Sequence, residues 1–190
     1  MTIGIITNDD TQVFQADIIA GVRERMLPAG HEVRVAAIGE PPHETVTLPA
    51  DDLDGLIVIA NVLSEKHLVD LSLSGRPMTL VSHRVAGLPI PAVIQNNVEG
   101  INRLVDYLVA ACGRRQLAFI AGDMNQHDGV ARTQMYEHRL MHHDILPLDG
   151  YILPGDFIPS MAYDTTLAFI DSGAPFDGVI AADYLMGVAA

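Results

Sequence analysis

The sequence predicts an α/β protein with two lobes, each a parallel sheet flanked by helices. Short apolar runs alternate with longer amphipathic stretches along all 190 residues. Strands that alternate with helices in this way are typical of parallel sheets with helices on both faces. The pattern begins again after Asn96, which favours two similar lobes over one long sheet. We therefore expect an N-terminal lobe over 1–96, a crossover near Asn96, and part of a C-terminal lobe over 97–190.

The first lobe opens with a β-branched run, 2–7, that is typical of a buried parallel strand. The polar segment 8–11 follows and can cap a helix. Apolar residues then recur at helical spacing from Phe14 to Met26. An acidic, proline-containing connection is expected over 39–52. Further runs predict a short helix at 65–73 and strands at 32–38, 55–60, 78–82 and 92–94.

The second lobe repeats the alternation of helices and strands. On its first helix we expect Ile101, Leu104, Val105 and Leu108 to share the buried face. Three strands and a last helix of two turns leave this lobe incomplete, so we expect the natural chain to continue beyond its last residue. The spacing predicts helices over 98–111, 129–141, 161–171 and from 185 onward, and strands over 116–121, 151–154 and 178–181.

The composition argues against several classes of protein. The net charge is −13, from 24 acidic residues against 11 lysines and arginines, and an acidic surface repels phosphate backbones. We therefore expect contact with DNA only through a segment absent from this chain. No apolar run approaches the roughly 20 residues of a membrane span, and no signal peptide precedes the first strand. These features predict a cytoplasmic protein without membrane contact. The single cysteine, Cys112, agrees with a reducing compartment, and we expect it to be buried.

Polar loops at the carboxyl ends of the strands supply the candidate binding residues, because ligands of such sheets bind there. The guanidinium of Arg132 offers a fixed fork of donors for hydroxyl pairs, carboxylates or phosphates, with an ordinary ion pair as the alternative. Asp183 can accept from two sugar hydroxyls or a base N–H, unless it only caps a helix. The flat rings of Phe14 and Phe157 can hold a sugar ring or a base, unless they pack in the core.

Four further side chains in these loops can orient a polar ligand, with solvation of the loop as the alternative for each. They are Asp9, His83, Gln126 and Asp128.

No catalytic or cofactor motif stands out. The chain has no dinucleotide fingerprint, no P-loop and no nucleophile elbow. His138 and His142 are four residues apart and could place two imidazoles on one helix face. However, Arg139 stands where the metalloprotease motif has its glutamate. We therefore expect no metal, no cofactor and no enzymatic activity.

Several stretches, in order along the whole chain, resemble the effector-binding domain of lactose- and galactose-repressor-type (LacI/GalR) regulators. They are Ile3-Gly4-Ile5-Ile6, Asn96-Asn97-Val98-Glu99-Gly100, the segment ACGRRQLAFIAG at 111–122, Arg132, Gly155-Asp156-Phe157 with Tyr163, and Ala181-Ala182-Asp183 with Met186. The chain departs from the family where an asparagine replaces the crossover aspartate and where Cys112-Gly113-Arg114 lacks the family's histidine.

The resemblance implies a periplasmic-binding-protein-like type I fold, with two lobes around a cleft and three crossovers. It also implies a small sugar- or purine-like ligand, closure of the lobes on binding, and a homodimer. The returning crossovers and final strands are missing here. Gly155-Asp156-Phe157 resembles the purine-repressor branch, but Gln126 stands where that branch has a charged contact.

Three functions stay open at this point. The first is a sensing domain that controls an attached output, either a DNA-binding headpiece or a kinase or cyclase. The second is an exported solute-binding protein of a transporter, which would need a signal sequence. The third is a sugar- or nucleotide-processing α/β enzyme, for which no catalytic set is found.

Overall fold

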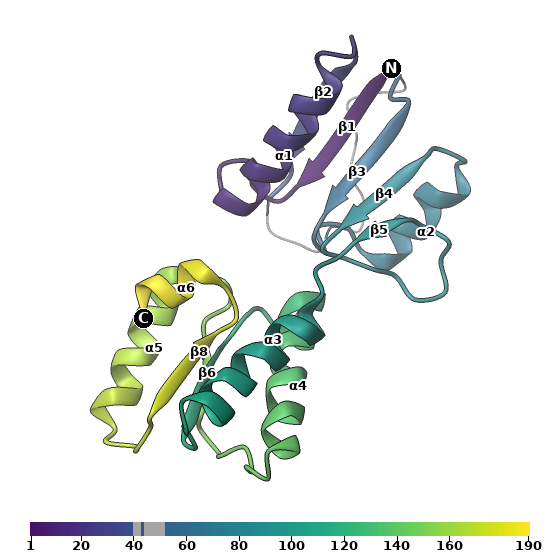
Figure 1. Cartoon of the computed structure of the whole chain (residues 1–190). Coiled ribbons are helices and arrows are strands. Elements are labelled where there is room, and N and C mark those ends of the chain that lie inside the picture. Colours follow the sequence, from purple (N-terminus) through teal and green to yellow (C-terminus); the bar gives the residue numbers. More distant parts are fainter. Residues whose placement is uncertain (40–42, 44–51) are drawn as a thin grey trace. The chain divides into compact units, whose positions relative to one another are not determined.

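The computed structural model describes residues 1–39, 43 and 52–190, and it divides into two compact units, Met1–Ile94 and Gln95–Ala190. Each unit holds one parallel sheet with helices packed on it (Figure 1), which confirms the predicted α/β class. Most of the connection expected over 39–52 lies outside the described residues.

Unit 1 is built on a five-stranded parallel sheet in the order β2-β1-β3-β4-β5. Neighbouring residues of a strand point to opposite faces, so both faces of this sheet are apolar. Ile6 and Val58 pack with Leu68 of α2 on one face, while Ile5 packs with Ile19 of α1 on the other. The elements are β1 (Thr2–Thr7), α1 (Val13–Met26), β2 (Glu32–Ala37), β3 (Gly55–Ile59), α2 (Glu65–Leu73), β4 (Met78–Val81) and β5 (Ala92–Val93).

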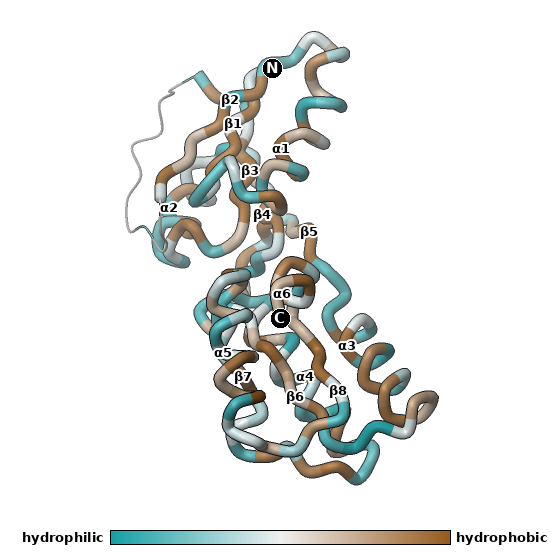
Figure 2. The backbone as a smooth tube through the Cα atoms, turned by 90° about the vertical axis from the view of Figure 1, so that its left-hand side faces the viewer, coloured by the Kyte–Doolittle hydropathy of each residue, from teal (hydrophilic) through white to brown (hydrophobic). Residues whose placement is uncertain are grey.

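Unit 2 is built on a three-stranded parallel sheet in the order β7-β6-β8. All five residues of the central strand β6 are buried, and β6 and β8 are hydrophobic along their length (Figure 2). The elements are α3 (Asn97–Asp106), the π-helical turn η1 (Tyr107–Ala111), β6 (Leu117–Ala121), α4 (His127–His142), β7 (Ile152–Pro154), α5 (Pro159–Asp171), β8 (Gly178–Ala181) and α6 (Tyr184–Ala189).

The end of the first helix of unit 2 differs from the prediction. Leu104 is 48% exposed, because the buried positions Ile101, Val105 and Val109 follow one another at every fourth residue. The last of them, Val109, lies in η1. The wider turn of η1 places Val109 on the buried face in place of Leu108. The prediction of a buried Cys112 is also wrong. Cys112 is exposed, because it lies in the turn that closes the helix.

An ion cluster joins α3 to the end of α4. The carboxylate of Asp106 accepts hydrogen bonds from Nε and Nη2 of Arg139, each at 2.7 Å, and His143 Nε2 lies 2.6 Å from Asp106 Oδ1. The bonds from Arg139, then from His143, lower the pKa of Asp106 to about 2. His138 and His142 are exposed. Within the described residues, no group of three or more histidines, cysteines or acids could hold a metal ion.

We expect the Asp106 cluster to make unit 2 sensitive to acid. The pKa of Asp106 is lower in the folded chain than in the unfolded one, so its contribution is present above about pH 4 and is lost as the pH falls towards 2. Its side chain is 37% exposed, so solvent screening limits the contribution to about 1 kcal/mol or less. Urea unfolding of wild type and Asp106→Asn across this range should show a shallower pH dependence in the variant. Identical pH profiles would show that the cluster contributes nothing.

Candidate ligand-binding site

Unusual backbone conformations gather at the carboxyl ends of the strands. Four of the five non-glycine residues with positive φ in the described part of the chain lie there: Ala60 after β3, Ser82 after β4, and Asp156 and Phe157 after β7. Such conformations cost roughly 1–3 kcal/mol each and cluster at ligand sites. The strain therefore marks, in each unit, the edge of the sheet where parallel α/β proteins bind ligands.

At this edge of unit 2, Arg132 on α4 is held by three neighbours. Its Nε donates to Asn97 Oδ1 and its Nη1 to the backbone oxygen of Ala182, both at 2.8 Å. Its Nη2 lies 3.6 Å from Asp128 Oδ2, and the Arg132 side chain is 17% exposed. A guanidinium has five N–H groups. The N–H groups that face these neighbours fix its orientation, and the other two N–H groups face none of the three.

Phe157 lies against the same arginine. The Cζ atom of Arg132 is 5.8 Å from the centre of the Phe157 ring, within the range of a cation–π contact. The loop that carries the ring is fixed because the backbone N–H groups of Gly155 and Asp156 both donate to Ala121 O, at 3.0 and 3.1 Å. Phe157 itself has φ of +60°. This backbone conformation brings the ring over Gly122, as the close approach of the two residues shows.

Glycines make room for this arrangement. A Cβ atom on Gly122 would lie 2.1 Å from the Phe157 ring, and one on Gly129 would lie 2.0 Å from Asp123 O. The first glycine lets the ring sit on the end of β6. The second lets the first turn of α4 approach the loop before it, where Gln126 Nε2 donates to Asp123 Oδ2 at 3.2 Å.

Asp183 closes the edge after β8. Its Oδ1 accepts a hydrogen bond from the backbone N–H of Met186 at 2.8 Å, so it is the N-cap of α6. The residue before it, Ala182, supplies the oxygen that binds Arg132. Asp183 therefore does cap a helix, the alternative role that the sequence left open for it. A ligand-binding role for the same carboxylate stays a prediction.

We expect Gly122→Ala to displace the Phe157 ring while unit 2 stays folded. The new Cβ atom clashes with the tip of one side chain, not with backbone, so rotation of Phe157 can relieve the overlap. Ligand affinity should fall at least about tenfold if the ring is a binding platform. Calorimetric titration measures the affinity, and far-UV circular dichroism checks the fold. As a control, Gly187→Ala on α6 meets only ordinary contact at 3.4 Å and should bind like wild type.

In unit 1 the corresponding edge holds Asp9, Phe14 and His83. Asp9 Oδ1 accepts from the backbone N–H and the hydroxyl of Thr11, at 2.8 and 2.6 Å. These bonds, the hydroxyl first, lower the pKa of Asp9 and so favour its charged form. Phe14 is exposed on the first turn of α1, and His83 is partly buried after β4. The carboxylate of Asp9 is thus held in place by Thr11 of its own loop. Phe14 is not part of the core.

Sequence reasoning missed Asn97 and Gln15. Asn97 is buried at the start of α3 and binds both Arg132 and Asp128. Gln15 is buried on α1 and donates through Nε2 to Asn8 Oδ1 at 3.0 Å, while its Oε1 accepts no hydrogen bond from the described residues. Asn97 belongs to the stretch Asn96–Gly100 that carries the resemblance, but nothing in the sequence shows that Asn97 or Gln15 is buried.

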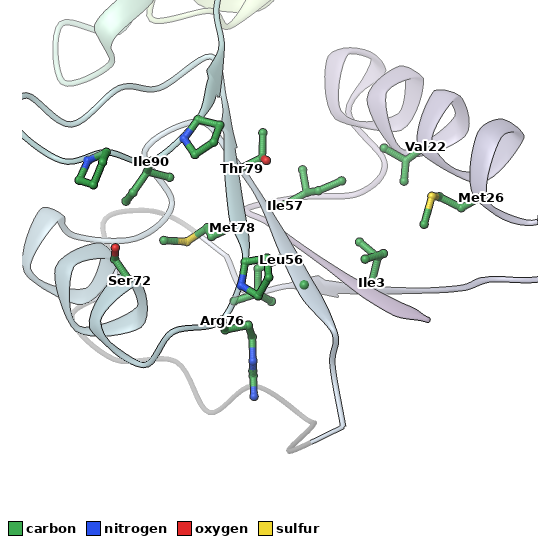
Figure 3. A pocket seen from close by; sticks show the side chains of 14 residues that line it. Ile3, Val22, Met26, Leu56, Ile57, Ser72, Arg76, Met78, Thr79 and Ile90 are labelled. Atoms are coloured by element: carbon green, nitrogen blue, oxygen red, sulfur yellow. The ribbon is translucent and has the colours of Figure 1, made fainter.

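Unit 1 also has an apolar hollow of about 540 Å³ (Figure 3). Its lining includes Ile3 at the start of β1, Ile57 in β3 and Thr79 in β4, together with Met26 at the end of α1. It therefore lies towards the amino ends of the strands, away from the polar loops. Its lining offers a ligand few polar partners and includes none of the expected binding residues.

The structure thus brings together five of the expected binding residues in unit 2. They are Gln126, Asp128, Arg132, Phe157 and Asp183. The other three, in unit 1, lie on or next to the loops that follow β1 and β4.

Comparison with known proteins supports the fold. No protein-family model and no curated protein sequence matches the chain. A LacI-family transcriptional regulator from Burkholderia phymatum is similar, with a TM-score of 0.82 and 24% identity over 99% of this chain and 70% of that one. The lac repressor dimer bound to operator and the anti-inducer ONPF gives 0.85 and 20%, over 99% and 66%. The regulator CelR with cellobiose gives 0.78 and 21%, over 99% and 60%.

None of the helices in the described residues has the length and apolar character that a membrane crossing requires. Strands and helices alternate along each unit, as the sequence predicts. The chain therefore has the two-unit, periplasmic-binding-protein-like α/β fold of LacI-family transcriptional regulators.

Proposed function

We propose that this chain is the small-molecule-sensing domain of a LacI-type transcriptional regulator or of a related cytoplasmic signalling protein. The observation that carries the proposal is the pairing of Arg132 with Phe157 at the carboxyl edge of unit 2. A ring platform beside an oriented fork of donors suits a flat or ring-shaped polar ligand. The fold in which this pair occurs is shared with two regulators whose structures hold a small molecule, cellobiose in one and the anti-inducer ONPF in the other.

The ligand in this proposal is a sugar or a purine-like base. Phe157 supplies the apolar face, Arg132 donates to hydroxyl or carbonyl oxygens, and Asp183 and Gln126 accept or donate at the rim. Asp9, Phe14 and His83 of unit 1 are proposed to contribute to ligand binding as well. A similar protein is known with cellobiose, which supports the choice of sugars.

Regulation in this proposal follows from differential affinity. The ligand favours the closed arrangement of the lobes, and an attached output responds to that shift. We propose that the chain acts as a homodimer, because a similar protein, the lac repressor, is a dimer bound to operator. DNA contact would come only through a segment outside this chain. No catalytic step is part of the proposal.

A thermal-shift screen tests the function. Sugars, purines and amino acids are added to wild type, and a ligand at about 100 times its dissociation constant should add about 2.7 kcal/mol to stability. Phe157→Leu removes the aromatic face and should reduce the shift. Tyr163→Leu makes a similar change on α5, where Tyr163 is 53% exposed, and should keep it. No shift with any compound, or equal shifts in both variants, would count against the proposal.

A further inference from the structure

The charge at the carboxyl edge of unit 2 is unbalanced. We define this edge as residues 122–128, 155–158 and 182–183, together with Arg132. It carries four carboxylates, on Asp123, Asp128, Asp156 and Asp183, against the single guanidinium of Arg132. An anionic ligand that approaches Arg132 therefore meets a field of its own sign.

One of these carboxylates, that of Asp128, contacts Arg132 directly. Asp128 Oδ1 accepts from Asn97 Nδ2 at 2.7 Å, Asn97 Oδ1 accepts from Arg132 Nε at 2.8 Å, and Asp128 Oδ2 lies 3.6 Å from Arg132 Nη2. The three side chains form a closed ring. Because only 9% of the Asp128 side chain is exposed, its carboxylate is held in place and screened little by water.

We propose that Asp128 determines the charge selectivity of this site. Its carboxylate neutralises Arg132 from inside the protein, so the site takes an uncharged ligand with hydroxyl or amide groups and rejects phosphate and carboxylate groups. This inference rests on the proposed function for its ligand, but it concerns a residue that touches Arg132 and not the ligand. Asp128 is thus a specificity-determining residue in place of the direct ligand contact that the sequence suggests.

The position of Asp128 on α4 strengthens the argument. It lies in the first turn of this 16-residue helix, where backbone N–H dipoles favour a negative charge. The protein's own carboxylate occupies the place that a bound anion would otherwise share with Arg132. If its charge is removed while its shape is kept, the guanidinium and the helix start become available to an external anion.

The test is titration with inorganic phosphate, by calorimetry, of wild type, Asp128→Asn and Asp156→Asn. Asparagine keeps the shape at residue 128 and can still bond to Asn97. Asp156 is exposed on the neighbouring loop and has φ of +49°, which asparagine tolerates. The two variants lose the same charge at the same edge. We expect Asp128→Asn to bind phosphate at least about tenfold more tightly than wild type. We expect Asp156→Asn to behave like wild type.

Three outcomes would overturn the inference. One is saturable phosphate binding by wild type that is lost in Arg132→Lys. Another is an equal gain in phosphate affinity in both asparagine variants, which would show that only the net charge of the edge matters. The third is a folded Asp128→Asn that gains no affinity for phosphate. If Asp128→Asn does not fold, Asp128→Ser, which also removes the carboxylate charge, takes its place in the same titration, and a folded Asp128→Ser without a gain in phosphate affinity overturns the inference.

These results are separable from those of the ligand screen. A wild type that binds no sugar or purine, while Asp128→Asn gains phosphate binding, contradicts only the proposed function. A wild type that binds a neutral ligand and phosphate equally well contradicts only the charge selectivity of Asp128.

Discussion

Replacing Phe119 with alanine is expected to lower the free energy of unfolding of unit 2 by about 3–5 kcal/mol. Phe119 is fully buried in β6, the central strand of its sheet. Its ring stacks on that of Tyr136 from α4, with 4.7 Å between ring centres and 17° between planes. The cavity left behind is bordered by β7 and β8 on both sides, so it can collapse only in part. Since whole domains are stable by about 5–15 kcal/mol, this loss threatens the fold of the unit.

Urea unfolding followed by circular dichroism measures this loss, and hydrogen exchange locates it. Amide protection should fall in β6 and β7 and stay high in β1 and β3 of unit 1, which has its own core. Leu104→Ala serves as the control, because Leu104 is in the same unit but half exposed. A Phe119→Ala midpoint that moves no further than that of Leu104→Ala would contradict the assignment of β6 as the centre of the core.

The strands were predictable because a buried parallel strand appears in the sequence as a short, continuous run of apolar residues. β1 and β8 coincide with the runs at 2–7 and 178–181, because strands of a parallel sheet covered by helices favour apolar residues at most positions. The loops at their carboxyl ends follow from the same pattern. The edge that carries the candidate residues could therefore be located from the sequence, without knowledge of any contact.

The contacts within that edge could not be predicted, because they join distant parts of the chain. Asn97 and Arg132 are 35 residues apart, and Arg132 and Ala182 are 50 apart. The approach of Phe157 to Gly122 depends on a left-handed backbone that a phenylalanine rarely adopts. Periodicity likewise gave no sign of the π-helical turn that leaves Cys112 exposed.

Arg132 shows most clearly how these contacts change an expectation. From the sequence alone, Arg132→Ala should weaken ligand binding by about 1.5–3 kcal/mol and leave stability nearly unchanged, because no core volume is lost. In the structure, the same change removes the bonds to Asn97 and Ala182 and leaves Asp128 charged and buried. We therefore expect unit 2 to lose about 3–5 kcal/mol of stability, the scale of a broken buried ion pair.

A double-mutant cycle separates the two effects of Arg132. Arg132→Met keeps the apolar stem and removes the charge, and Asp128→Asn removes the partner's charge. If the loss of stability comes from an uncompensated Asp128, the double variant should be more stable than the sum of the single losses predicts, with a coupling of about 1–3 kcal/mol. Additive losses, measured by urea unfolding of all four proteins, would contradict this. Ligand affinity should behave differently, because restoring charge balance cannot restore the N–H donors. A double variant that regains stability but not binding would show that Arg132 has both roles.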